Sequence, residues 1–574
     1  MKESLNITET HPLVALLSDL HVKFFAGVTG GGVIHFLKHI ARYSGKCDVE
    51  PAFFTIGEYV AGFIPLGYYL SSGTVAASVA TTGAATKLIG CGLSDAKLHN
   101  IPSVYIVPLC EPEASGFGPL QDTSVYGSNI LAQLQAELPD STFVLDETFS
   151  IDETYTRIQT LLQHGKPVVF VLTKSSSNID FGIFRRASII EGGAFEDLSW
   201  RMDYFILKFR QAVQNRRIVI VVGDEMRRCA RVKELTTQLS LALRAETIWS
   251  INGANAVSRE NPYGYGYISF GGNDKAMEIF RSLGEDDVVL LLGGCSDEYT
   301  TNLKKIIASD LFYLGEAENS YGMVNNSFAH ITTGNYDQVL GDMHTALTHL
   351  ITKVQEEPCG NIPARPAPAD LNNHAFIRAN HNYVDMVDLY QRLDSYWRKN
   401  SIAFDDVCLA YKDRQYILSR PNDNIDFYSL YRGSAMGGAF GTAVGAKIAN
   451  PERDVYCFTG DGCFRLFAGC LGEAAKLGIV LFLLNNERLG IVDQGLRKVL
   501  HDFPEEQYHA DVIAVDYQGV ALSFGWNAAR LLPDLSNLSD VLDQIEPTME
   551  RSLLIEVPID PNQLLGSNPR LVNL

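Results

Sequence analysis

The chain has 574 residues, too many for one hydrophobic core, so about two to four domains are expected. Hydrophobic residues make up 46% and charged residues 20%, as in an ordinary globular protein. A net charge of −20 argues against a nucleic-acid surface or an anionic membrane as partner. The ten cysteines form no CxxC pair, and the first residues lack a signal-peptide pattern, so we expect reduced thiols in a cytoplasmic protein.

Short apolar runs recur along the chain and are separated by helix-like segments. Each run is uninterrupted rather than alternating, which predicts strands buried on both faces of a parallel sheet. In chain order, the clearest runs are 103–107, 168–172, 218–222, 288–292, 455–458 and 479–484. This rhythm predicts an α/β protein built from doubly wound parallel sheets.

Two breaks divide this rhythm into three units. The polar run 174–178 follows one predicted strand, and the segment 356–369 holds four prolines and a glycine. We therefore expect α/β units at about 1–175, 190–350 and 370–574. The proline-rich segment between the last two should act as a semi-rigid linker.

The third unit contains the sharpest candidate for a functional site. The predicted strand 455–458 runs into Thr459-Gly460-Asp461-Gly462-Cys463. A predicted helix at 466–477 leads to the strand 479–484, which ends at Asn485-Asn486. Because adjacent parallel strands end at one edge of a sheet, we expect the acid and the amide to lie side by side where such sheets bind ligands.

The residue types at these two strand ends suit a metal-bound phosphate. Gly460 and Gly462 allow the backbone to approach a phosphate closely. Asp461 and Asn486 supply oxygen ligands of the kind that Mg²⁺ prefers. The alternative is that both segments are plain turns, since short motifs often match by chance.

The order strand, GDG, helix, strand, NN resembles the signature of the thiamine-diphosphate-dependent enzymes. The resemblance implies that Asp461 and Asn486 bind Mg²⁺ through their side chains and Arg488 through its main-chain carbonyl. It implies further contacts with thiamine diphosphate at Gly460, Gly462, Cys463, Gly490 and Ile491.

The first unit carries similar blocks. Glu58 resembles the family's glutamate that hydrogen-bonds the aminopyrimidine ring, although it could simply be a helix N-terminal glutamate favoured by the dipole. Gly30 closes a turn similar to an early glycine turn of the family, and Thr82 opens a block similar to its next one. The resemblance therefore implies that Gly30 and Thr82 also contact the cofactor.

A further block lies in the third unit, at Ser434 to Gly438. Met436 resembles the aliphatic residue that wedges between the two cofactor rings, and Ser434 is expected beside it. The alternative is a methionine that fills a gap in the core. The middle unit resembles the family least, mainly at 262–267 and 290–294.

The resemblance implies three doubly wound domains, which in this family are the pyrimidine-binding, central and diphosphate-binding domains. It also implies a homodimer or homotetramer in which the first unit of one subunit faces the third unit of another. Thiamine diphosphate then adds to a 2-oxo acid and carbon dioxide leaves. The acyl carbanion can be protonated, oxidised or passed to a second carbonyl.

The third of these fates is favoured by resemblance. The decarboxylases that protonate the carbanion carry an acid after the early glycine turn, a His-His pair and a glutamate after NN. In this chain Gly31 follows the glycine turn and Val492 stands after NN. No His-His pair occurs. Gln121 resembles the glutamine of acetolactate synthases, and 489–494, ending at Gln494, resembles another block of theirs. We therefore predict carboligation from a small, pyruvate-like 2-oxo acid.

One departure and three alternatives complete the sequence interpretation. Gly495 stands where the synthases have tryptophan, which predicts an acceptor larger than pyruvate. A non-ligating decarboxylase and a flavin-linked oxidase are the enzymatic alternatives, with FAD undecided because the middle unit has no GxGxxG. A cofactor-binding protein without activity is the third. The joint presence of Glu58, Asp461 and Asn486 argues against it.

Overall fold

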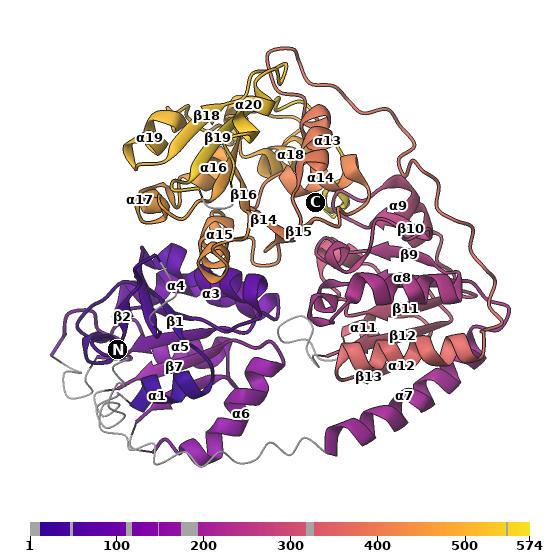
Figure 1. The fold of residues 1–574 in the computed structure, drawn as a ribbon, viewed down its shortest axis with the longest axis horizontal. Coiled ribbons are helices and arrows are strands. Elements are labelled where there is room, and N and C mark those ends of the chain that lie inside the picture. Colours follow the sequence, from indigo (N-terminus) through magenta and orange to yellow (C-terminus); the bar gives the residue numbers. More distant parts are fainter. Residues whose placement is uncertain are drawn as a thin grey trace.

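In a computed structural model of the chain, three α/β units follow one another along the sequence, each built on its own sheet (Figure 1). The structure describes residues 12–45, 50–110, 117–146, 148–173, 193–316, 327–546 and 549–573. Every strand pair in the three sheets is parallel, and helices connect the strands. This confirms the predicted fold class of doubly wound parallel sheets.

The first sheet has seven strands in the order β2-β3-β1-β4-β5-β7-β6. Its strands are β1 (Phe24–Gly27), β2 (Ala41–Arg42), β3 (Ala52–Thr55), β4 (Ala77–Val79), β5 (Val104–Pro108), β6 (Thr142–Leu145) and β7 (Val168–Leu172). Its helices are α1 (Pro12–Asp19), α2 (Ile34–Leu37), α3 (Glu58–Ser72), α4 (Ala84–Leu98), α5 (Ile130–Glu137) and α6 (Ile151–Gln163).

The middle sheet has six strands in the order β10-β9-β8-β11-β12-β13. Its strands are β8 (Ile218–Val222), β9 (Glu246–Trp249), β10 (Gly264–Tyr267), β11 (Val288–Leu292), β12 (Asp310–Gly315) and β13 (Asn335–Leu340). Its helices are α7 (Gly193–Ala212), η4 (Asp224–Arg228), α8 (Val232–Leu243), η5 (Gly253–Ala256), α9 (Asp274–Arg281), α10 (Glu298–Thr301), α11 (Ser327–Ile331) and α12 (Met343–Glu356).

The third sheet also has six strands, in the order β15-β14-β16-β17-β19-β18. Its strands are β14 (Ser401–Asp405), β15 (Ile425–Ser429), β16 (Val455–Gly460), β17 (Val480–Asn485), β18 (Asn527–Arg530) and β19 (Leu553–Pro558). Its helices are α13 (Met386–Tyr396), α14 (Ala410–Leu418), α15 (Gly438–Ala449), α16 (Asp461–Phe464), η6 (Ala468–Cys470), α17 (Leu471–Ala474), α18 (Gly490–Val499), η7 (Glu505–Gln507), α19 (Tyr517–Ser523), α20 (Leu538–Leu542) and η8 (Pro569–Val572).

The first and third units are joined by the crossing of α3 and α15, which lie against each other in Figure 1. Glycines make this crossing close: a Cβ on Gly67 would lie 1.7 Å from the carbonyl oxygen of Thr442, and one on Gly445 would lie 2.1 Å from that of Ile64. Side chains from both units therefore form one continuous hydrophobic cluster around the crossing.

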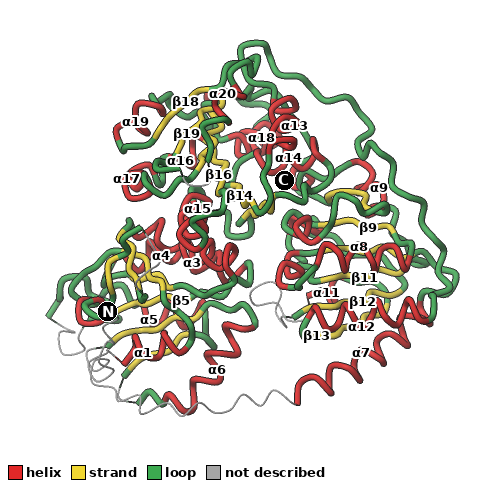
Figure 2. Tube along the Cα trace, viewed as in Figure 1, coloured by secondary structure: helices red, strands yellow, loops and turns green. Residues whose placement is uncertain are grey.

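The proline-rich segment after α12 runs over the middle unit as a long loop (Figure 2). It is held there by main-chain hydrogen bonds, from Ile362 to Arg216 (2.8 Å), from Ala364 to Arg244 (2.7 Å) and from Ala367 to Pro262 (2.7 Å). The segment is therefore docked along its length. The other predicted break, at 174–178, lies outside the described residues.

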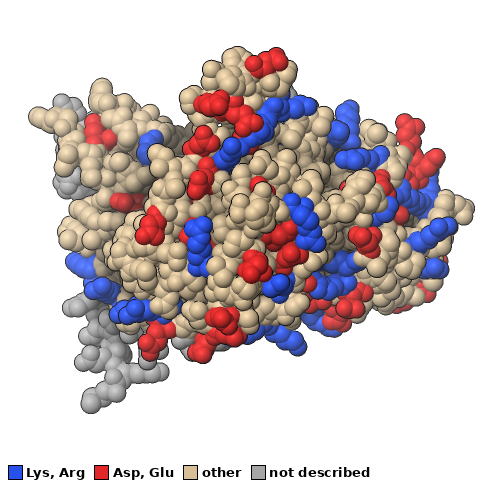
Figure 3. Space-filling model, turned by 90° about the horizontal axis from the view of Figure 1, so that it is seen from above, with Lys and Arg blue, Asp and Glu red and all other residues tan. Residues whose placement is uncertain are grey.

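Opposite charges are interspersed on the face shown in Figure 3, despite the net charge of −20. Patches of lysine and arginine and patches of aspartate and glutamate lie near one another on this face, with broad uncharged areas between them. Within the described ranges, no helix has both the length and the apolar character needed to cross a bilayer.

Candidate functional site

A cleft lies in the third unit at the carboxyl ends of β14, β16 and β17, which are consecutive in the sheet. Gly460 pairs with Leu484, so the chain leaves β16 and β17 at the same level. The cleft has about 680 Å³ of empty space, part of it open to solvent. Nine residues singled out in the sequence line it: Met436, Gly460, Asp461, Gly462, Cys463, Asn486, Arg488, Gly490 and Ile491.

Asp461 is the central polar group of this cleft. One carboxylate oxygen, Oδ1, accepts a hydrogen bond from the N–H of Gly462 at 3.0 Å. The other, Oδ2, is buried and has no hydrogen-bond partner among the residues that the structure describes. Burial raises the pKa of Asp461 to about 6, although the N–H groups of Gly462 and Glu487 lower it. An unpaired buried carboxylate is costly, so this oxygen suits a cation.

The turn after β17 supplies the neighbouring oxygens. The side-chain oxygen of Asn486 accepts a hydrogen bond from the N–H of Arg488 at 3.0 Å, and Glu487 between them has the left-handed φ of 55°. The guanidinium of Arg488 faces acidic side chains, at 3.9 Å from Asp493 and 3.7 Å from Asp511. Any metal contact of Arg488 must therefore come from its main-chain carbonyl.

The same cleft also suits a phosphate. A Cβ on Gly462 would lie 2.5 Å from Cδ2 of Leu489, so a side chain at Gly462 would crowd the floor of the cleft. Helix α18 begins at Gly490 on its rim, and the N-terminus of a helix favours anions. Among the described residues no group of three or more His, Cys, Asp or Glu could hold a metal. A metal here would rely on Asp461, on amide and carbonyl oxygens, and on the phosphate, as Mg²⁺ commonly does.

The loop before α15 reaches the cleft through Met436. The main-chain carbonyl of Met436 accepts a hydrogen bond from the hydroxyl of Tyr59, the residue after Glu58, and burial raises the pKa of that hydroxyl. Ser434, in contrast, lines a separate hollow with Asp297 and its neighbours, and its hydroxyl donates to the carbonyl of Tyr431 at 2.6 Å.

Three predicted residues of the first unit form a second group, at the carboxyl edge of the first sheet. The hydroxyl of Thr82 donates to the side-chain oxygen of Gln121 at 2.6 Å. A Cβ on Gly30 would lie 2.2 Å from the hydroxyl oxygen of Thr81, so the turn after β1 packs directly on this group. None of the three lines the cleft of Asp461 in the single chain.

Glu58 and Gln494 also lie outside the lining of the cleft. Glu58 is the first residue of α3, and the preceding Gly57 packs on the sulfur of Cys470 in the third unit. Gln494 lies on α18, where its side-chain oxygen accepts a hydrogen bond from Asn568 of the C-terminal segment at 3.2 Å. The thiol of Cys463 lies 3.4 Å from the carbonyl of Val407, which also lines the cleft.

One wall of the cleft was missed by the sequence analysis. It is the loop after β14, which contributes Val407, Cys408 and Leu409. Burial raises the pKa of Cys408 well above its usual value, so its thiol adds no charge to this wall. The available signal was the pair Asp405-Asp406, which ends an apolar run just as Asp461 does.

Comparison with protein families gives two matches. The N-terminal TPP binding domain of the thiamine pyrophosphate enzymes matches residues 8–125, and their C-terminal TPP binding domain matches residues 411–557. The second match contains the whole sequence from β16 to β17, and the first contains Glu58, Thr82 and Gln121.

Several curated proteins are similar over most of the chain. The acetolactate synthase isozyme 1 large subunit of Escherichia coli K12 is 23% identical, over 96% of this chain and 94% of that protein. The acetolactate synthase large subunit of Lactococcus lactis is 21% identical, over 95% and 92%. A 3D-(3,5/4)-trihydroxycyclohexane-1,2-dione hydrolase of Bacillus cereus is 20% identical, over 61% and 59%.

Proposed function

Because the chain belongs to the thiamine pyrophosphate enzymes, we propose that it decarboxylates a small, pyruvate-like 2-oxo acid and transfers the acyl unit to a second carbonyl compound. Its two TPP-binding domains indicate thiamine diphosphate as the cofactor. The observation that carries the proposal is the cleft at β16 and β17, where the unpartnered buried oxygen of Asp461 lies beside Asn486.

Each unit has a role in this proposal. We assign 1–175 as the pyrimidine-binding domain, 190–350 as the central domain and 370–574 as the diphosphate-binding domain. Asp461, Asn486 and the carbonyl of Arg488 would hold Mg²⁺, and the N-terminus of α18 would face the diphosphate.

The side chains around the cleft would then prepare the reaction. When bound, thiamine diphosphate supplies the nucleophilic carbon and the electron sink. Glu58 would hold a proton at the aminopyrimidine ring, which is ordinary acid–base practice in enzymes. Met436 would set the bend of the cofactor from the rim of the cleft, and Leu409 with its neighbours would exclude water.

Transfer to a carbonyl, rather than to a proton, is supported by two features. Gln121, which resembles the glutamine of acetolactate synthases, is held by Thr82, and relatives with that printed name match nearly the whole chain. Because Gly495 stands where the synthases have tryptophan, the acceptor would be larger than pyruvate. A decarboxylase that does not ligate is the second candidate, because the identity with these relatives is low.

We also propose that each active site is shared between two subunits. Beside Gln121, the apolar side chains of Phe117, Leu120, Val125 and Tyr126 are 72% to 91% exposed. In the third unit, Val492 on the rim of the cleft is 48% exposed and Ile513 is 79% exposed. Exposed apolar patches of this kind mark interaction surfaces, so we propose at least a homodimer that joins the two edges. An active monomer in sedimentation would contradict it.

The test of function is carbon dioxide release from pyruvate by the purified protein, with and without added aldehydes, followed by mass spectrometry of the products. We expect release that requires thiamine diphosphate and Mg²⁺, and a ligation product that appears with the aldehyde. Free acetaldehyde as the only product would identify a non-ligating decarboxylase. Cofactor binding without turnover of any 2-oxo acid would identify a binding protein.

A further inference from the structure

The middle sheet has the strand order in which a dinucleotide site would be expected. Its first two strands in sequence, β8 and β9, extend to one side and β11 to the other, so the order reverses between β8 and β11. In doubly wound sheets, ligands bind in the crevice outside the carboxyl ends of the strands at this point. The crevice here is bounded by the residues that follow Val222 and Leu292.

The backbone leaves no room for a pyrophosphate between the ends of β8 and β11. A Cβ on Gly223 would lie 2.3 Å from the Cα of Gly294, so the two chain segments are already in contact. The N–H groups that could hold a phosphate are used internally: those of Gly223 and Gly293 donate to strand carbonyls at 2.8 and 2.7 Å, and that of Glu225 donates to Gly293 at 3.0 Å.

The side chains at the crevice have the wrong charge for a phosphate. Asp224 and Glu225 open η4 directly after β8, and both are buried. Asp297, also buried, caps the N-terminus of α10 by accepting a hydrogen bond from the N–H of Thr300 at 3.0 Å. Ser250 donates to Asp224 at 2.7 Å, which holds that carboxylate in place.

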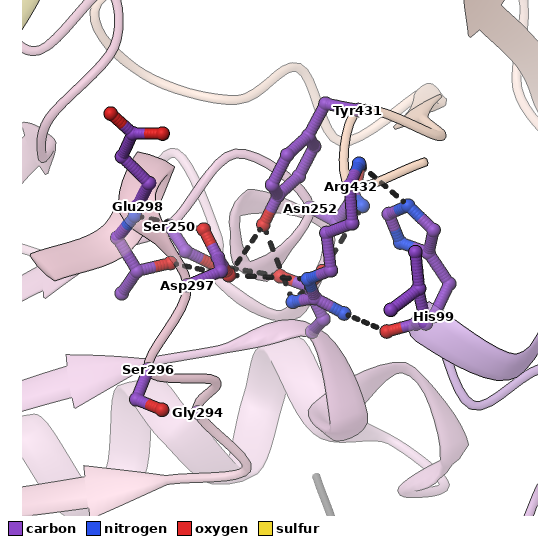
Figure 4. Close-up of polar contacts among 12 residues, drawn as sticks. His99, Ser250, Asn252, Gly294, Ser296, Asp297, Glu298, Tyr431 and Arg432 are labelled. Carbon is purple, nitrogen blue, oxygen red and sulfur yellow. Dashed lines mark hydrogen bonds and ion pairs between the residues drawn. The ribbon is translucent and has the colours of Figure 1, made fainter. Parts of the chain in front are cut away.

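A cation from the third unit occupies the crevice instead (Figure 4). Nη2 of Arg432 lies 2.8 Å from Oδ2 of Asp224, and its Nε lies 3.1 Å from Oδ2 of Asp297. The three side chains are only 2% to 4% exposed. The remaining guanidinium nitrogen, Nη1, donates to the carbonyl of Leu98 in the first unit at 3.1 Å.

The backbone beside Arg432 is tied to the first unit as well. Its own N–H donates to Nε2 of His99 at 3.2 Å, so this nitrogen carries no proton. Burial and the nearby arginines likewise lower the pKa of His99 well below its usual value. The N–H of Gly433 donates to Asp95 at 2.9 Å. Met436 follows three residues later and reaches the cleft.

We propose that the crevice of the middle unit is a socket for Arg432, which positions the loop carrying Met436, and that the middle unit binds no flavin dinucleotide there. A guanidinium bridging two buried carboxylates fixes geometry more than it adds stability, because all three charges lose their water. The flavin-linked oxidase among the sequence alternatives would then lack its second cofactor.

Flavin content tests the first half. The purified full-length protein is denatured by heat and the released flavin is measured by fluorescence, and the native protein is titrated with FAD. We expect no released flavin and no saturable binding. Flavin released at about one per chain, or saturable binding of added FAD, would overturn the proposal.

Cofactor affinity tests the second half, with Arg432→Ala compared with Arg281→Ala, an exposed arginine of the same protein. Calorimetric titration with thiamine diphosphate and Mg²⁺ is done well below the melting temperature of each variant. We expect roughly tenfold weaker binding in Arg432→Ala, as when an outer support of a metal site is lost, and no change in Arg281→Ala. Unchanged affinity in both variants would leave Arg432 a stability element only and overturn its positioning role.

Two further variants keep this half testable if Arg432→Ala does not fold. Asp297→Asn retains the shape of the socket but removes one of its two charges, and is expected to weaken cofactor binding to a smaller extent. Arg432→Lys keeps the positive charge but lacks the rigid, planar set of donors that meets both carboxylates and the carbonyl of Leu98, and is expected to fall between the wild type and Asp297→Asn. Wild-type affinity in both would contradict the positioning role. These readouts concern binding only, so they stand even if the proposed ligation reaction fails.

Discussion

The middle and third units show the same strand-end device with opposite outcomes. In each, a buried strand ends in Gly-Asp at the edge where the sheet order reverses: Gly223-Asp224 after β8, and Gly460-Asp461 at the end of β16. Asp224 is paired with Arg432 at 2.8 Å, whereas Oδ2 of Asp461 has no hydrogen-bond partner in the described parts of the chain. Sheet topology creates both crevices, and the neighbouring side chains decide whether the chain fills one or leaves it to a ligand.

The difference has a physical cause that a motif alone does not carry. A buried carboxylate must be neutralised, paired or bound to a metal. The middle unit pairs its carboxylate with a residue 208 positions away in the sequence. The third unit leaves its carboxylate beside amide and carbonyl oxygens, which only a cation from solution can complement. Gly-Asp at a strand end is therefore informative only together with its surroundings.

The largest expected effect concerns Glu58 of the first unit, which would act on the cofactor bound in the cleft of Asp461. Glu58→Gln should slow turnover about a thousandfold, the range of a lost acid–base group, while thiamine diphosphate still binds. The measurement is hydrogen exchange at the reactive carbon of the cofactor, alongside turnover. Glu50→Gln, which breaks an exposed ion pair with Lys23 in the same unit, is the matched control. Exchange at the wild-type rate in Glu58→Gln would remove Glu58 from the site.

The next effect concerns the cleft of Asp461 itself. Asp461→Asn should weaken Mg²⁺-dependent binding of thiamine diphosphate about a hundredfold, because the metal loses a charged ligand. Calorimetric titration with and without EDTA measures it, and EDTA should abolish the difference between variant and wild type. Asp534→Asn, an exposed carboxylate in the same unit, should have no effect. Undiminished metal-dependent binding would mean that the metal site lies elsewhere.

A pair of glycine substitutions compares the crevice that Arg432 fills in the middle unit with the cleft of Asp461 in the third unit. Gly223→Ala forces a Cβ against backbone atoms of Gly294, which cannot move aside, and should cost about 1–3 kcal/mol of unfolding free energy. Gly462→Ala meets the flexible end of Leu489, so it should cost less stability but more cofactor affinity. Urea unfolding and cofactor titration of both variants check this. Equal losses of both kinds in the two variants would erase the contrast.

Much of the fold could be predicted because its strands are buried on both faces. The runs 168–172, 218–222 and 288–292 are strands residue for residue, because an unbroken apolar run of this length suits a strand buried on both faces. The cleft could be predicted for the same reason: once 455–458 and 479–484 are adjacent strands, the polar residues after them must meet. The placement of Glu58, Ser434 and Gln494 around it remains a prediction.

Other features could not be read from local patterns. The predicted helix at 466–477 is shorter and irregular in the structure, where η6 and the four-residue α17 cover 468–474. Gly469 and Gly472 lower the helix propensity of this segment. The indole N–H of Trp526 also donates a hydrogen bond to the carbonyl of Leu471 at 2.6 Å. The socket of Arg432 could not be predicted either, because its partners come from the first and middle units and leave no periodic signal in the sequence.

The smallest predicted effect concerns the specificity for the acceptor. It tests whether the acceptor binds where the cleft of Asp461 extends along α18. Gly495→Trp should lower turnover with a bulky acceptor such as benzaldehyde roughly tenfold and spare self-condensation of pyruvate, because the indole would refill the acceptor space. The structure adds a competing explanation, since Asn568 of the C-terminal segment reaches α18 and donates to Gln494, the residue before Gly495. If that segment covers the space, Asn568→Ala rather than Gly495→Trp should alter acceptor preference. Competition between the two acceptors, read by mass spectrometry for both variants, separates these cases. Equal loss on both acceptors in Gly495→Trp, with no change in Asn568→Ala, would place the acceptor away from α18 altogether.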